Sequence, residues 1–226
     1  MDSSLWGPVT DIVQPRGALV QSSAHPQLGG VHSARGVQSM ATEELVNELR
    51  QKMEQERSAL IAAARGLSSG DALYVPKDAS GEEQWTALEQ LAHLCEMEKS
   101  YDAWVRAALR HDNPDLSDVR GDAVDIPIEA ANGHDVDTML RALEVERAYT
   151  RGLIDGISQD GFDRTATSLV FGALTVLQWL RSFYRHDRQH AAQIQGRQSS
   201  YQPNFKSGKE PNQRQARIDL VAKRNG

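Results

Sequence analysis

Apolar side chains recur every three to four residues in four long stretches of the chain, which is the spacing of one face of an α-helix. In the first stretch, Leu45, Leu49, Met53 and Leu60 follow this spacing and Gly66 is the expected stop. The pattern predicts helices over about 42–65, 85–110 and 135–154, and a fourth from after Gly172 to about 194.

Two of these helices have a sequence signal for their first turn. Thr86 with Glu89, and Thr175 with Gln178, have the spacing of a capping box. No run of β-branched residues is long enough for a substantial sheet, and an acidic stretch over residues 112–125 separates the second helix from the third. The predicted fold is therefore an all-α four-helix bundle with long connections.

The helical pattern is confined to the middle of the chain. Residues 1–39 are rich in Gly, Pro, Ser and Gln, and residues 201–226 are polar and basic. We expect flexible extensions at 1–39 and 201–226, and the bundle at 40–200. Polar extensions would also explain why only 39% of the 226 residues are apolar, below the roughly 45–50% of an average domain.

Charge and composition exclude several classes of protein. The net charge of −6 argues against a general nucleic-acid binder. No stretch approaches the roughly 18 consecutive apolar residues of a membrane span. The sequence does not begin with basic residues followed by an apolar run, so we expect no secretory signal. Cys95 is the single cysteine, which excludes an intrachain disulfide framework and a Cys-rich zinc site. We expect a cytoplasmic protein.

The fourth predicted helix carries the strongest candidate for chemistry. His186 and His190 are four residues apart and therefore lie one turn apart on one face, where their rings can bind one ion. Trp179 and Phe183 precede them on the same stripe, which indicates that the pair faces the bundle. Such pairs also occur by chance on solvated helix faces, so this pair alone leaves both interpretations open.

His93 lies on the second helix, on a stripe with Met97 and Trp104. By itself it is better explained as a core histidine bonded to Glu89 or Glu96. Together with the pair on the fourth helix, it would complete a site of three nitrogen ligands with coordination positions left open. An open position is what lets a metal ion bind water or substrate.

Two segments of the chain resemble the DinB-like superfamily of small four-helix metalloproteins. They are W-T-x-x-E-x-L-x-H-L, beginning at Trp85, and H-D-x-x-H-x-x-Q-I, beginning at His186. The resemblance covers roughly residues 42–198. It implies His93, His186 and His190 as ligands of a divalent ion, nickel or zinc before iron or manganese. Relatives in that family include bacillithiol transferases and mycothiol-dependent isomerases.

A site of this kind would make a bound water or thiol easier to deprotonate. We therefore expect a metal-dependent hydrolase or thiol transferase that acts on a small molecule, with a low-molecular-weight thiol as a possible partner. We separately expect the chain to form a homodimer. Glu89 and Glu96 are candidates to orient His93 through its far nitrogen, although both are equally well explained as solvated helix charges. Asp187 points about 100° away from His186 and is not expected to be a ligand, and Cys95 is expected to be a buried structural thiol.

Other interpretations differ in strength. A non-catalytic bundle, whose metal stabilises the fold or a dimer interface, stays open. A zinc protease of the H-E-x-x-H type is disfavoured because Asp187 replaces the glutamate. The only third ligand downstream at a plausible distance is Glu210, in a polar segment next to Pro211. A di-iron bundle is excluded because this sequence lacks the paired Glu-x-x-His motifs that such a bundle needs. The acidic stretch over 112–125 does not have the ligand spacing of an EF-hand calcium loop, so we expect a solvated loop there instead of a calcium site.

Overall fold

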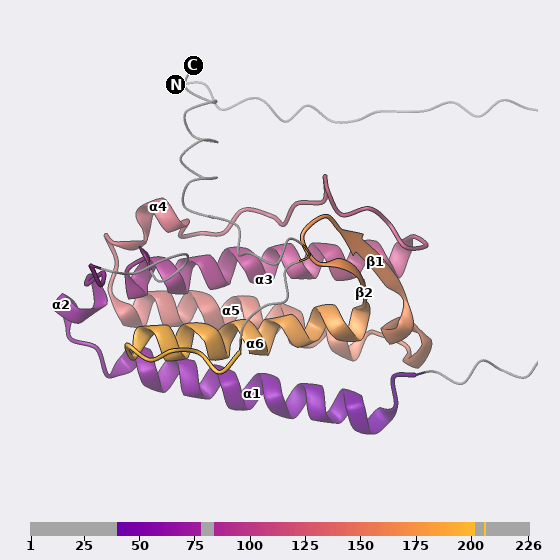
Figure 1. The fold of residues 1–226 in the computed structure, drawn as a ribbon, viewed down its shortest axis with the longest axis horizontal. Helices are drawn as coiled ribbons and strands as arrows, with labels where there is room; N and C mark the ends of the chain where they lie inside the picture. The colour runs from indigo at the N-terminus through magenta and orange to yellow at the C-terminus, as the bar shows by residue number, and fades with distance from the viewer. Residues whose placement is uncertain (1–39, 78–83, 202–205, 207–226) are drawn as a thin grey trace, which may run out of the picture. The chain divides into compact units, whose positions relative to one another are not determined.

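Four long helices lie side by side in the computed structural model, which describes residues 40–77, 84–201 and 206. They are α1 (Glu43–Arg65), α3 (Ala87–Arg110), α5 (Val136–Asp155) and α6 (Val176–Ile194) (Figure 1). Helix α1 packs on α6, α6 on α3, α3 on α5, and α5 on α1. The all-α four-helix bundle is thus confirmed. The predicted extensions at 1–39 and 201–226 lie outside the described residues, apart from positions 201 and 206.

The helices begin where their side chains satisfy the free backbone N–H groups of the first turn. Thr86 with Glu89, and Thr175 with Gln178, form complete capping boxes, as predicted. Asp135 caps α5 by accepting a hydrogen bond from the backbone N–H of Thr138. The observed boundaries therefore fall within a few residues of those expected from the sequence.

Short elements fill the connections: α2 (Ser69–Ala72), α4 (Ile128–Ala131), the 3₁₀ helix η2 (Gln159–Asp163), β1 (Thr165–Ser168) and β2 (Gly172–Thr175). The two strands pair antiparallel, with Thr165 opposite Thr175 and Ser168 opposite Gly172. Gly172 has φ of +80°, a conformation that glycine adopts without strain. This hairpin was not predicted, because four-residue strands without a β-branched run give almost no periodic signal.

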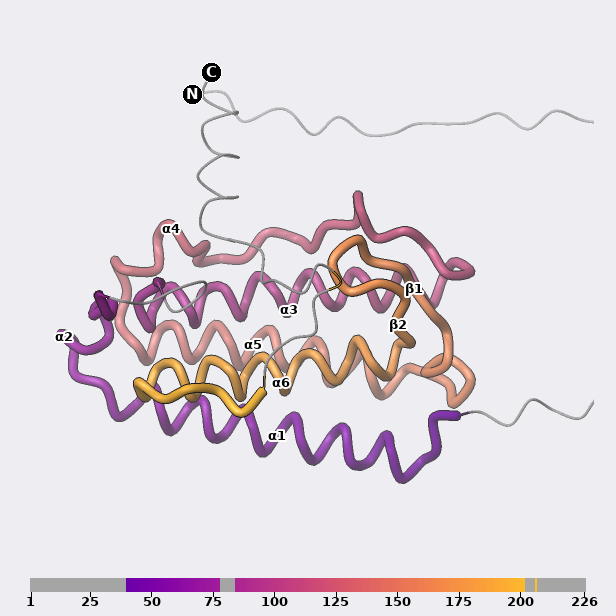
Figure 2. Tube along the Cα trace, in the orientation of Figure 1, coloured from indigo at the N-terminus to yellow at the C-terminus, as the bar shows by residue number. Residues whose placement is uncertain are grey.

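The long connection between α3 and α5 runs along α3 (Figure 2). The indole N–H of Trp104 donates to the carbonyl of Val119, and the backbone N–H of Ile128 donates to the carboxylate of Glu96. The acidic stretch is thus held against the bundle, and with the hairpin it encloses space beside α3 and α6. Among the described residues, no helix is both long and apolar enough to cross a membrane.

The core consists of two apolar clusters separated by a polar layer. One cluster contains Leu49, Met53, Trp179 and Phe183 at the end of the bundle near the hairpin. The other contains apolar residues from the C-terminal half of α1 and the N-terminal halves of α3 and α5. Between them every long helix contributes buried polar or charged side chains: Glu56, Arg57, His93, Glu98, Arg147, Thr150, His186, Asp187, Gln189 and His190. The candidate chemistry lies in this layer.

Candidate metal centre

Three histidines converge in the polar layer. His186 and His190 lie one turn apart on α6, and His93 reaches them from α3. All three are buried, and one possible ligand atom from each lies within 4.8 Å of the other two. The sequence placed these residues on inward stripes of two helices, and the packing of α3 against α6 brings them together.

The spacing of the ring nitrogens fits a single ion. Nε2 of His186 and Nε2 of His190 are 3.0 Å apart. Two nitrogens that bind one tetrahedral ion at about 2.1 Å would be roughly 3.4 Å apart. The ring of His93 lies edge-on to both others, with centroid distances of 4.9 Å to His186 and 5.6 Å to His190. A cluster of neutral imidazoles is the donor set that zinc, nickel and iron accept.

Gln90 fixes the tautomer of His190. The side-chain amide of Gln90 donates to the carbonyl of Trp85 at 3.2 Å, so its oxygen faces the other way and lies 3.0 Å from Nδ1 of His190. A carboxamide oxygen can only accept, so Nδ1 carries the proton and Nε2 presents a lone pair towards His186. This is the arrangement that orients a histidine as a metal ligand.

The sequence offered Glu89 and Glu96 as candidates to orient another of the three histidines, His93. In the structure, Glu89 accepts from the backbone N–H of Thr86 at 2.8 Å, and Glu96 accepts from the N–H of Ile128 at 3.1 Å. Both carboxylates therefore stabilise backbone, at a helix start and in a connection, and their proposed role towards His93 stays a prediction. Gln90 was overlooked because an uncharged residue three positions before His93 carries no distinctive sequence signal.

Next to the histidines lies a cavity of about 610 Å³. His93 and His186 form part of its wall, together with residues of α3, α6, the α3–α5 connection and the β1–β2 hairpin. The rings of Tyr101, Trp104 and Phe171 line its apolar side. A volume of this size accommodates a small-molecule ligand, so the histidine cluster is accessible from a binding space.

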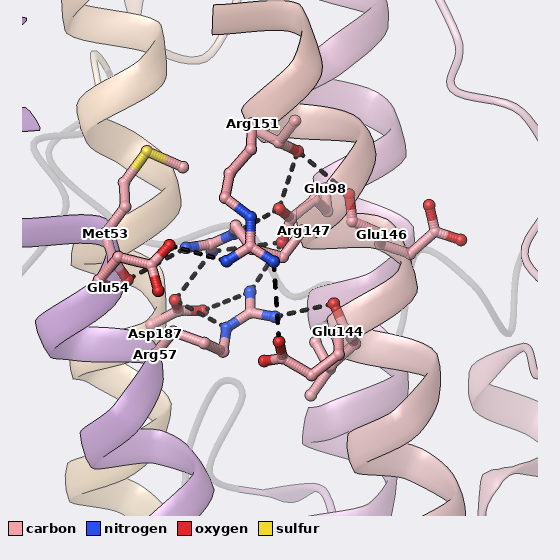
Figure 3. A network of polar contacts seen from close by, with 11 residues as sticks. Met53, Glu54, Arg57, Glu98, Glu144, Glu146, Arg147, Arg151 and Asp187 are labelled. Carbon is pink, nitrogen blue, oxygen red and sulfur yellow. Dashed lines mark hydrogen bonds and ion pairs between the residues drawn. The ribbon is translucent and has the colours of Figure 1, made fainter. Parts of the chain in front are cut away.

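Asp187 belongs to a second buried cluster, as its predicted orientation away from the histidine face implies. Figure 3 shows Arg57 of α1 and Arg147 of α5 meeting Asp187 of α6 and Glu98 of α3. Arg57 contacts both oxygens of Asp187 at 3.1 Å and Glu98 at 2.7 Å. Arg147 contacts Glu98 at 2.6 Å and Asp187 at 2.9 Å, and the hydroxyl of Thr150 donates to Glu98. Each of the four helices thus supplies one charge.

The pKa values in this cluster follow its charge balance. Burial would raise the pKa of Asp187, but Arg57 and Arg147 outweigh it and hold the pKa below its ordinary value. Burial likewise opposes the charge of Arg57, yet Asp187 and Glu98 raise its pKa above its ordinary value. Both groups therefore stay charged at neutral pH. The sequence signal for this cluster was available: Arg57 stands four residues after Met53 and three before Leu60, on the apolar stripe of α1.

Cys95 is buried, as expected for a structural thiol. Burial is the main reason that its pKa is raised to about 12, and nearby Arg57 lowers it only in part. The thiol therefore stays protonated at neutral pH and is a poor nucleophile.

Comparison with known proteins agrees with this architecture. The solved structure of YfiT from Bacillus subtilis, described as a probable metal-dependent hydrolase with an unusual four-helix bundle topology, is similar with a TM-score of 0.54 at 16% identity. The match covers 69% of this chain and 86% of the YfiT chain. No match is found among the curated proteins compared.

The family model described as the DinB superfamily matches residues 52–194. That range begins within α1, ends at the last residue of α6, and contains all three histidines. The resemblance seen in the two sequence segments is thereby confirmed over more than half of the chain. This protein belongs to the DinB superfamily.

Proposed function

We propose that this protein is a metal-dependent enzyme in which His93, His186 and His190 hold one divalent ion at the wall of the 610 Å³ cavity. The reaction is hydrolysis of, or thiol transfer to, a small molecule bound in that cavity. The observation that carries the proposal is the convergence of three buried imidazoles, from two helices, at the surface of a ligand-sized space.

The number of protein ligands supports a catalytic over a structural site. Structural zinc sites are closed by four protein ligands, whereas catalytic sites use three and leave a position for water or substrate. Among the described residues, the candidate group contains three histidines and no carboxylate or thiol. Two of the three histidines also border the cavity, so an open position could face the substrate.

The bound ion would supply Lewis acidity, which lowers the pKa of a water or thiol ligand. The chain's own residues position and enclose the reactants. Gln90 holds His190 in the tautomer that exposes Nε2. Trp104 and Phe171 form part of the apolar wall and exclude water from one side of the substrate. Hydrolysis would add water across an ester or amide bond, while thiol transfer would form a C–S bond and release a leaving group.

The description of YfiT as a probable metal-dependent hydrolase agrees with this proposal. At 16% identity the similarity itself concerns the fold, so the substrate and the choice between the two reactions have to come from experiment.

The test is calorimetric titration of the purified, chelator-treated protein with zinc and with nickel. We expect one ion per wild-type chain and a loss of at least about 100-fold in affinity for His190→Ala, because removing one of three ligands leaves two. His134→Ala is the matched control, since His134 is exposed in the turn before α5. Wild-type protein that binds neither metal would contradict the proposal.

Activity assays then separate the reactions. Metal-loaded protein is compared with His190→Ala in conjugation of small thiols and in hydrolysis of aryl esters and amides. Metal-dependent turnover in one assay identifies the reaction class. A tightly bound ion that gives no turnover, with its coordination closed by protein, would favour the structural role instead.

A further inference from the structure

The wall of the cavity beside the histidines is positively charged. Arg120, from the α3–α5 connection, and Arg185, from α6, both line it. Among the described residues that form this wall, none is an aspartate or glutamate. The chain as a whole carries a net charge of −6, so this space reverses the sign of the protein around it.

Arg185 is well placed to bind a ligand. It immediately precedes His186, and its guanidinium carbon lies 5.5 Å from the ring centroid of Tyr201 and 5.8 Å from that of Tyr184. The Arg185 guanidinium also hydrogen-bonds the Tyr201 side chain. These contacts orient it, and the remaining N–H groups stay available around its edge. Such an edge can donate two parallel hydrogen bonds to a carboxylate, sulfonate or phosphate.

Arg120 is held by backbone contacts at one edge. Its Nη1 donates to the carbonyl of Ser117 at 2.6 Å and to that of Val119 at 3.1 Å. These contacts use one terminal nitrogen and fix the position of the side chain. The guanidinium has five N–H donors in all, so the other N–H groups of Arg120 can donate to an anionic ligand beside Arg185.

The other part of the wall is apolar and aromatic. Tyr101 packs on Trp104 with a centroid distance of 5.3 Å, and Trp104 packs on Trp179 at 5.2 Å. Phe171 and Leu174 of the hairpin region contribute further apolar surface to the cavity. Rings packed in this way form a rigid surface that suits a flat, apolar ligand.

We propose that the cavity binds a small molecule that combines an anionic group with an apolar, ring-sized body. Arg185 and Arg120 bind the anion, and the aromatic wall binds the body. That the bound molecule is the substrate rests on the proposed function, since its reacting end would face His93 and His186. The preference for an anion rests on the two arginines alone and holds without a metal ion.

The test uses two fluorescent probes with the same aromatic body. 8-Anilinonaphthalene-1-sulfonate carries an anionic group, and N-phenyl-1-naphthylamine lacks it. Binding of each probe to the full chain is measured by fluorescence titration, in chelator and again after metal loading. The variants are Arg185→Gln, Arg120→Gln, their combination, and Arg185→Lys. Arg141→Gln is the control, because Arg141 is exposed on α5. The thermal midpoint of each variant verifies that it is folded.

We expect one sulfonate probe per chain, bound more tightly than the neutral probe. The double variant should lose about tenfold or more in affinity for the sulfonate probe, the size of a lost charge-assisted contact, with little change for the neutral probe. Arg185→Lys should retain more of the affinity than Arg185→Gln, and Arg141→Gln should match wild type. Equal binding of both probes by wild type, or equal sulfonate affinity in wild type and a folded double variant, would overturn the inference.

Metal uptake by the same samples keeps the two claims separate. Arginine-dependent anion binding by protein that takes up no metal would support this inference and contradict the proposed function. Metal uptake without arginine-dependent anion binding would support the proposed function and contradict this inference.

Discussion

The two polar clusters of the bundle are built from neighbouring residues, but only one of them consists of opposite charges that pair with one another. His186 and Asp187 are consecutive on α6, so their side chains leave the helix about 100° apart. Asp187 joins Arg57, Arg147 and Glu98, where two positive and two negative charges satisfy one another. His186 joins two further imidazoles beside a cavity. One cluster is neutralised by charges within the chain, and the other is the candidate site of the proposed divalent ion.

The difference indicates what each cluster does. Asp187, Glu98, Arg57 and Arg147 have at most 3% of their side-chain surface exposed. A saturated buried ion network positions the four helices relative to one another, and it becomes costly once a member is missing. The histidine cluster consists of imidazole rings that converge around a common point, which is the arrangement expected of a binding site.

The largest expected effect comes from breaking the ion cluster. Glu98→Gln should reduce the free energy of unfolding by about 3–5 kcal/mol, because it leaves Arg57 and Arg147 without one of their two carboxylates. Urea unfolding of the metal-free protein measures this loss. Glu54→Gln is the control, since its ion pair with Arg151 is exposed, and should change stability by less than about 1 kcal/mol. A loss from Glu98→Gln no larger than that of the control would show that the cluster is not important for stability.

A metal ion should stabilise the other cluster by a smaller amount. At roughly a hundredfold excess of free ion over its dissociation constant, binding to the folded state adds about 2.7 kcal/mol. Thermal unfolding with zinc or nickel, and after chelation, measures the shift. His190→Ala should show no such shift, whereas His134→Ala should behave as wild type. Equal shifts in His190→Ala and wild type would place metal binding elsewhere.

Removing the partner of His190 should weaken the site without abolishing it. Gln90→Leu deletes the oxygen that fixes the His190 tautomer, and losses of roughly 10–100-fold in metal affinity are typical of such outer partners. Calorimetric titration measures the change, with Gln55→Leu on the exposed face of α1 as the control. Unchanged affinity in folded Gln90→Leu protein would show that Gln90 does not orient the ligand.

The smallest effect is expected at Glu89, and it should concern stability only. Glu89→Ala removes half of the capping box of α3 and should cost about 0.5–1 kcal/mol of unfolding free energy, in the lower range for helix caps. Metal affinity should change by less than about twofold. A tenfold loss of affinity would instead restore Glu89 as the partner of His93 that the sequence suggested.

These contrasts also show how far the sequence was informative. Helix positions and both capping boxes could be predicted, because period and cap chemistry are local properties of the chain. The three histidines could be grouped because they lie on inward stripes and match a family pattern. The hydrogen-bond partners of the histidines could not be predicted. Whether Gln90 or Glu89 reaches an imidazole depends on side-chain directions that are set by the packing of α3 against α6.

The ion cluster and the cavity illustrate a second limit. Arg57 on an apolar stripe signals a buried charge, but its partners come from three other helices, and their identity requires the three-dimensional arrangement. The cavity likewise depends on the α3–α5 connection and the hairpin, whose positions follow from long-range contacts such as that of Trp104 with Val119. Local periodicity carries no information about either.

Visible spectroscopy of the protein loaded with Co²⁺ tests the three-histidine metal centre, because it reports both the ligands and the openness of a metal site. We expect one Co²⁺ per chain, d–d bands that require His93, His186 and His190, and a change of those bands when azide or a small thiol is added. Absence of bound Co²⁺ would contradict the metal centre. Bands that do not respond to azide or thiol would contradict its open, catalytic character.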